Sequence, residues 1–107
     1  MKGTYLRFYM HENRKHQHLL LYEWLLEQAR SSGIHGGSAS RAIAGYGRHG
    51  TLHEQHFFEL AGDLTIMVEF LLSDEEAQSL LDLVEREKVR VFYAKFPAEF
   101  GMTEGTD

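Results

Sequence analysis

The segment LTIMVEFLLSDEEAQSLL, residues 64–81, decides which fold this chain can adopt. Its first half, Leu64–Leu72, is apolar on both alternating faces and predicts a strand that is central in a sheet or covered twice. Ser73 and Glu76 then form a capping-box pattern, in which the Ser73 hydroxyl accepts a hydrogen bond from the backbone N–H of Glu76. Apolar residues follow at the spacing of one helical face and predict a helix to about Glu87. The segment is therefore a strand followed directly by a helix.

The N-terminal part of the chain repeats this plan. Tyr5–Met10 alternates large residues between two faces and predicts a strand. The polar segment His11–His18 predicts a connecting loop. A leucine-rich helix is expected over about Gln17–Ser32, and Gly33 follows where a left-handed C-terminal cap is needed.

Two further strands complete the pattern, Ser38–Ala44 and Val89–Phe96, and Pro97 is expected to end the second of them. The order of elements predicts an α+β, ferredoxin-like βαββαβ sandwich. In this fold an antiparallel four-stranded sheet carries two helices on one face, and here a long loop joins strands 2 and 3. We expect a single domain over residues 1–97 and a flexible C-terminal tail over residues 98–107.

The helix-free face of this sheet is expected to carry several large side chains. They are Tyr5, Tyr9 and Met67, with Leu71 and Tyr93 as further candidates. Such a patch exceeds what a monomer commonly leaves in water, so we expect an oligomer that buries it. Glu69 lies within the apolar strand and needs a partner there, for which Arg7 and Arg41 are candidates. A structural ion pair is the favoured interpretation over a catalytic carboxylate.

The composition excludes several classes of function. The 107 residues carry a formal charge of -5 and no cysteine. The acidic balance argues against a nucleic-acid binder, and the absence of cysteine excludes disulfides and thiol chemistry. We identify no signal peptide and no segment long enough to insert into a membrane, so a cytoplasmic protein is expected.

The glycine-rich stretch GYGRHG, residues 45–50, is the first candidate ligand site. Its backbone N–H groups and nearby guanidinium groups could form a nest for a small anion such as phosphate. The residues concerned are Arg41, Gly45, Tyr46, Gly47 and Arg48. The alternative is that the glycines only turn the chain, because the spacing matches neither a Walker loop nor a dinucleotide fingerprint.

Three histidines form a second candidate site. His49, His53 and His56 stand four and then three residues apart, so a helical turn would place their imidazoles on one face, as a metal site requires. Solvated loop histidines, or a pH response, are the alternatives. Catalysis has little support, since Ser38 and Ser40 lack a nucleophile-elbow context, and we expect that the protein is not an enzyme.

Three stretches together resemble a known family. LYEWLLEQARSSGIHGG, SRAIAGYGRHG and LTIMVEFLLSDEEAQSLL are similar to the PII-like domain of unknown function 190, whose fold is related to that of nitrogen-regulatory PII proteins. The resemblance covers nearly the whole chain, from Leu6 to about Phe96. One departure is that only Arg86, Lys88 and Arg90 lie just after the second helix, where PII signalling proteins place a basic cluster.

The resemblance implies a homotrimer with clefts between subunits that hold a small anionic ligand, an adenine nucleotide being the first candidate. It also implies that the loop 45–60 signals to a protein partner, a membrane transporter or channel among the candidates. The other hypothesis is a metal-binding or metal-tolerance trimer on the same frame, using the three loop histidines, whose affinity for metal falls as protons compete for imidazole.

Overall fold

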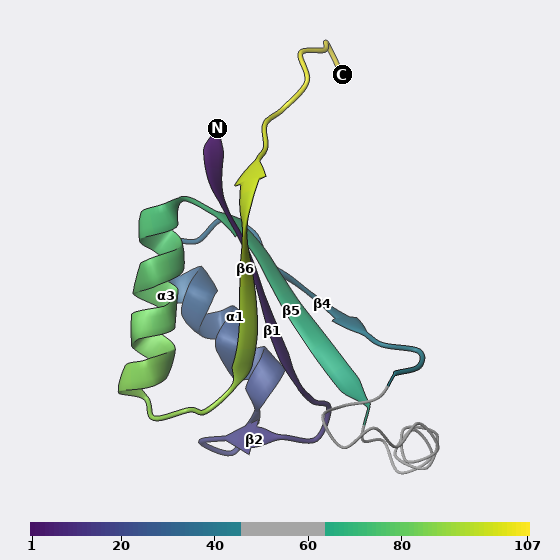
Figure 1. Cartoon of the computed structure of the whole chain (residues 1–107), viewed down its shortest axis with the longest axis vertical. Coiled ribbons are helices and arrows are strands. Elements are labelled where there is room, and N and C mark those ends of the chain that lie inside the picture. Colours follow the sequence, from purple (N-terminus) through teal and green to yellow (C-terminus); the bar gives the residue numbers. More distant parts are fainter. Residues whose placement is uncertain (46–63) are drawn as a thin grey trace.

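The structure is a computed structural model that describes residues 1–45 and 64–107. Within these residues, four strands form one antiparallel sheet in the order β4-β5-β1-β6, and two helices cover one of its faces (Figure 1). The elements are β1 Lys2–His11, α1 Leu21–Ser31, β4 Ser38–Arg41, β5 Thr65–Leu72, α3 Asp74–Arg86 and β6 Phe92–Glu99. The predicted α+β, ferredoxin-like architecture is confirmed.

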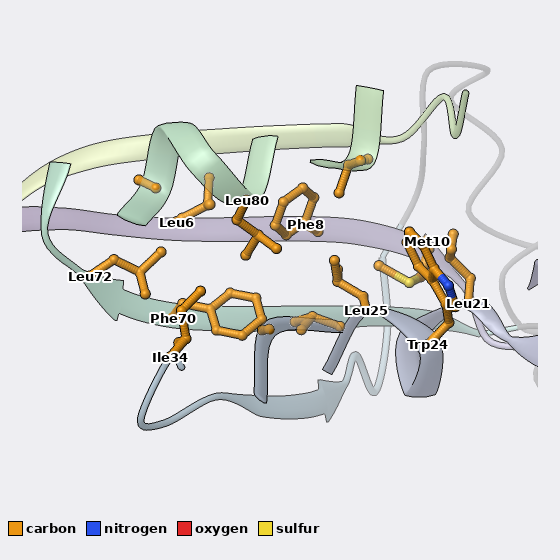
Figure 2. Packing of buried hydrophobic residues seen from close by; sticks show 14 of the residues in the cluster. Leu6, Phe8, Met10, Leu21, Trp24, Leu25, Ile34, Phe70, Leu72 and Leu80 are labelled. Atoms are coloured by element: carbon orange, nitrogen blue, oxygen red, sulfur yellow. The ribbon is translucent and has the colours of Figure 1, made fainter. Parts of the chain in front are cut away.

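The core lies between the helices and the two central strands, as Figure 2 shows. Each central strand contributes every second residue, because successive side chains of a strand point to opposite faces. These buried residues are Leu6, Phe8 and Met10 from β1 and Ile66, Val68, Phe70 and Leu72 from β5. Leu25 of α1 and Leu80 of α3 pack against them, so the apolar stripe of each helix is used.

Both helices end in the same way. Gly33 after α1 has φ 89°, and the N–H groups of Gly33 and Ile34 donate to carbonyls of the last helical turn over 3.1 Å. Lys88 after α3 has φ 60°, and the next amide, of Val89, donates to the Val84 carbonyl over 3.2 Å. This is the Schellman arrangement, in which glycine incurs no steric penalty and lysine does. The predicted cap at Gly33 and the capping box of α3 are confirmed.

The start of α1 differs from the sequence prediction. A small antiparallel ladder, β2 Lys15–His16 with β3 Leu19–Leu20, occupies the segment where the helix was expected to begin. The two residues between these strands, Gln17 and His18, have φ 52° and 69°, which suits a two-residue hairpin turn and excludes a helix. The predicted start at Gln17 is therefore wrong, and α1 begins at Leu21.

The last strand is also displaced from its prediction. It was expected to end at Pro97, but β6 continues to Glu99, because at a sheet edge a residue without an N–H need not break the ladder. Tyr93 pairs with Phe8 and so lies on the helix side of the sheet, where the two rings are 6.3 Å apart. Its predicted place on the helix-free face is wrong, and Phe92 and Phe96 lie there instead.

Candidate functional site

The face of the sheet opposite α1 and α3, here called the open sheet face, is rich in large apolar groups. Cross-strand register places its side chains together, because directly opposed residues share a face. They are Tyr5, Arg7 and Tyr9 from β1, Met67, Glu69 and Leu71 from β5, and Phe92 and Phe96 from β6. Leu71, Phe92 and Phe96 are 51%, 69% and 49% exposed. Contiguous exposed apolar groups of this kind mark an interaction surface.

A charged network lies at the centre of the open sheet face. Arg7 Nε is 3.7 Å from a carboxylate oxygen of Glu69, and Arg7 also donates to the hydroxyls of Tyr5 at 2.9 Å and Tyr9 at 3.3 Å. The hydroxyl of Tyr5 donates in turn to Glu69. These tyrosine hydroxyls hold the pKa of Arg7 above its ordinary value. Of the two partners predicted for Glu69, Arg7 is the correct one.

Two cavities meet at Gly36 and Gly37, between the end of α1 and the start of β4. The first, here called the Ser38 cavity, has a volume of about 330 Å³, and the second, here called the His35 cavity, has about 250 Å³. Besides the two glycines, the Ser38 cavity is lined by Tyr5, Ser38, Glu69, Phe70 and Leu71, and the His35 cavity by Leu26, Ala29, Arg30, Ile34, His35 and Phe70. Because Gly36, Gly37 and Phe70 line both cavities, the two cavities are direct neighbours.

The two compartments offer different chemistry. The Ser38 cavity presents hydroxyl groups and the acceptor oxygens of Glu69. The His35 cavity instead includes the guanidinium of Arg30, which pairs with Glu27 over 2.6 Å and 3.1 Å, and the imidazole of His35. Gly37 lets the backbone pass close to the Phe70 ring in the wall that the two cavities share, because a Cβ at this position would lie 2.5 Å from that ring. The site thus has an acceptor-rich end and a basic end.

The predicted ligand site at the glycine-rich stretch is only partly within the described residues. Arg41 lies at the end of β4, and its guanidinium donates to both carboxylate oxygens of Glu12 over 2.7 and 2.8 Å. This contact holds the pKa of Glu12 below its ordinary value. Gly45 is described, whereas the remaining predicted contacts, Tyr46, Gly47 and Arg48, lie outside the described residues.

The three histidines of the predicted metal site, His49, His53 and His56, also lie outside the described residues, so that site stays a prediction. In residues 1–45 and 64–107 there is no group of three or more potential metal ligands. The same part of the chain contains no helix long and apolar enough to cross a membrane.

Sequence reasoning missed most of the lining of the Ser38 cavity. Ser38, at the start of β4, has a small side chain beside which a ligand can approach. Tyr5 and Glu69, however, reach the cavity through strand register alone. A third cavity of about 300 Å³, between α3 and β6, is lined by both Arg90 and Lys95, and Lys95 lies beyond the basic residues noted in the sequence just after the second helix.

The sequence of this chain matches a family model and a known protein. Residues 3–91 match the sequence model of the family DUF190, described as an uncharacterized ACR. The UPF0166 protein of Aquifex aeolicus (strain VF5) is 30% identical over 101 residues, which cover 87% of this chain and 96% of that protein.

Two solved structures share the fold. CPII, a nitrogen regulatory PII-like protein from Thiomonas intermedia K12 whose structure holds ADP, AMP and bicarbonate, superposes with a TM-score of 0.59 at 17% identity, over 97% of this chain and 98% of that one. A protein from Thermus thermophilus, described as PII-like and signalling, gives 0.56 at 16% identity, over 92% of this chain and 86% of that one. At these identities the likeness shows the fold.

Proposed function

Because the chain belongs to the DUF190 family and has the fold of PII-like proteins, we propose that it is a non-enzymatic PII-like regulator that binds an adenine nucleotide. The pair of cavities at Gly36 and Gly37 is the observation that carries this proposal. The Ser38 cavity, at about 330 Å³, lies within the roughly 300–1,000 Å³ that small-molecule sites commonly measure, and the His35 cavity of about 250 Å³ adjoins it, so the pair together suits a ligand of nucleotide size. CPII, which shares the fold, is bound to ADP and AMP in its solved structure.

The protein acts as a homotrimer in this proposal, with the open sheet faces turned toward one another. The exposed apolar groups of that face support association, because burying them removes apolar area from water. Tyr5, Glu69 and Leu71 belong both to the open sheet face and to the lining of the Ser38 cavity. A neighbouring subunit seated on the face therefore adjoins the cavity, which becomes a cleft between subunits.

The anionic end of the ligand is assigned to Arg41, Gly45, Tyr46, Gly47 and Arg48. Arg41 lies in the same strand as Ser38, three residues or about 10 Å of extended chain away, and its side chain leaves β4 on the face opposite to that of Ser38. The loop 45–60 then responds to the ligand and contacts a protein partner in the cytoplasm, for which a membrane transporter or channel is the proposed class.

Calorimetric titration with ADP and AMP tests the ligand, and Gly36→Leu tests the site. Gly36 lines both cavities and a Cβ there meets no atom within 4 Å, so the fold accommodates a leucine whose side chain is intended to reduce the space open to a ligand. Gly101→Leu is the matched control, since Gly101 is equally unobstructed and lies in the tail. We expect saturable binding by the wild type and by Gly101→Leu, and none by Gly36→Leu. Equal binding by both variants would exclude the cavities as the site.

A further inference from the structure

Tyr5 touches two parts of the molecule at once. Its hydroxyl donates to Glu69, and both residues line the Ser38 cavity. Its ring packs edge to face against Phe96 of the open sheet face, with 5.9 Å between the ring centroids. A change in the position of the Glu69 carboxylate therefore reaches Tyr5 through one hydrogen bond. Tyr5 in turn contacts Phe96, which is exposed on the open sheet face.

Arg7 also contacts Tyr5 and helps to fix its position. It donates to the Tyr5 hydroxyl over 2.9 Å, and its guanidinium carbon lies 5.2 Å from the centroid of the Tyr5 ring. Its Nε atom is buried and has no hydrogen-bond partner among the described residues, while the nearest oxygen of the ion pair with Glu69 is 3.7 Å away. A buried donor without an acceptor is costly, so Arg7 gains from any shift that brings the Glu69 carboxylate closer.

We infer that Tyr5 links occupancy of the Ser38 cavity to association of subunits across the open sheet face, an inference that rests on the proposed function. A ligand that donates a hydrogen bond to Glu69 fixes that carboxylate, and with it the Tyr5 hydroxyl and the ring that packs on Phe96. Groups that are already ordered lose less entropy when a second subunit covers them. The ligand therefore strengthens association, and by linkage association strengthens ligand binding.

Tyr9 provides a matched control on the same strand and the same face. Its hydroxyl accepts from Arg7 over 3.3 Å, and its ring packs on Phe92 with 5.5 Å between centroids. It does not, however, line the Ser38 cavity or bond Glu69 in the described structure. Tyr5→Phe and Tyr9→Phe each remove one hydroxyl that bonds Arg7, and only the first removes a contact with the cavity.

Subunit exchange provides the test. Because the chain has no cysteine, Thr106→Cys in the exposed tail allows donor and acceptor dyes to be attached at one position. Energy transfer after mixing then reports the exchange rate, with and without saturating ADP. We expect ADP to slow exchange about fivefold or more in the wild type and in Tyr9→Phe, and by less than about twofold in Tyr5→Phe.

The outcomes separate the inference from the function on which it rests. No ADP binding by the wild type would overturn both, and so would a monomeric chain. Saturable ADP binding with equal slowing of exchange in both variants would overturn the role of Tyr5 alone. Circular dichroism of the variants checks that neither substitution alters the fold. A loss of slowing in both variants would assign the link to Arg7 in place of Tyr5 and would equally overturn the inference.

Discussion

The Glu12 carboxylate binds Arg41 through two hydrogen bonds of 2.7 and 2.8 Å, and it also accepts from the backbone N–H of Leu64 at 3.4 Å. The amide of Glu12 donates to the carbonyl of Leu64 over 2.6 Å. Glu12, which directly follows β1, therefore connects Arg41 at the end of β4 with Leu64, the residue before β5. One anion that Arg41 binds, the Glu12 carboxylate, therefore belongs to the protein itself.

Glu12→Gln is expected to tighten ADP binding if Arg41 contacts the anionic end of the ligand as proposed. The substitution removes an anion that competes with the ligand for the guanidinium, and because exposed ion pairs are weak the gain should be at most about fivefold in Kd. Calorimetry at low salt measures the change, which should shrink as salt screens the charges. Glu87→Gln, which removes a carboxylate that contacts His16 and Gln17 and lines neither cavity, serves as the control. An unchanged Kd in Glu12→Gln would remove Arg41 from the site.

The fold could be predicted because its strongest signals are local. The alternation of Leu64–Leu72, the capping box at Ser73 and the glycine at position 33 each act within one turn or one strand. The β2–β3 hairpin was missed because Gln17 and His18 adopt positive φ without being the glycine or asparagine that commonly indicates such a turn.

The candidate site could be predicted only in part, because its residues come together through tertiary register. Tyr5 stands opposite Leu71, and Ser38 stands opposite Glu69, so three segments far apart in the chain form one cavity. No spacing within the sequence encodes these pairings. The Tyr93 error has the same origin, since which side of an edge strand faces the helices depends on its pairing with β1.

Substitutions at the adjacent residues Gly36 and Gly37 are expected to change the free energy of unfolding by very different amounts. A Cβ at Gly37 would lie 2.5 Å from the ring of Phe70, which is 2% exposed in the core, whereas a Cβ at Gly36 meets nothing within 4 Å. Gly37→Ala should lower the free energy of unfolding by about 1–3 kcal/mol, because the packed core must shift. Gly36→Ala should change it by no more than about 0.5 kcal/mol. Urea denaturation measures both, and equal midpoints would show that Phe70 moves aside freely.

The backbone conformation at the C-terminal ends of α1 and α3 indicates a substitution that should stabilise the fold. Lys88 occupies a left-handed position at the end of α3, as Gly33 does at the end of α1. Lys88→Gly should raise the free energy of unfolding by roughly 0.5–1 kcal/mol, the steric penalty relieved being partly offset by the greater entropy of glycine in the unfolded chain. Gly33→Ala, which has open space around its Cβ, should lower it by about 1 kcal/mol. Thermal or urea unfolding decides, and a less stable Lys88→Gly would contradict the argument.

The open sheet face predicts a substitution that separates subunits without unfolding them. Phe96→Asp places a carboxylate among exposed apolar groups, where solvent tolerates it in a single subunit. Covering that carboxylate with a second copy would cost several kcal/mol of lost hydration. Light scattering should therefore show the mass falling from about three times 12.4 kDa toward that of one chain.

Leu19→Asp is the matched control, because Leu19 is similarly exposed, at 47%, but lies in β3 and outside the open sheet face. It should leave the mass of the assembly unchanged. Circular dichroism of both variants should match the wild type, because neither side chain belongs to the buried core. An assembly that survives Phe96→Asp but dissociates with Leu19→Asp would move the interface to the helix side and would separate the Ser38 cavity from any contact between subunits.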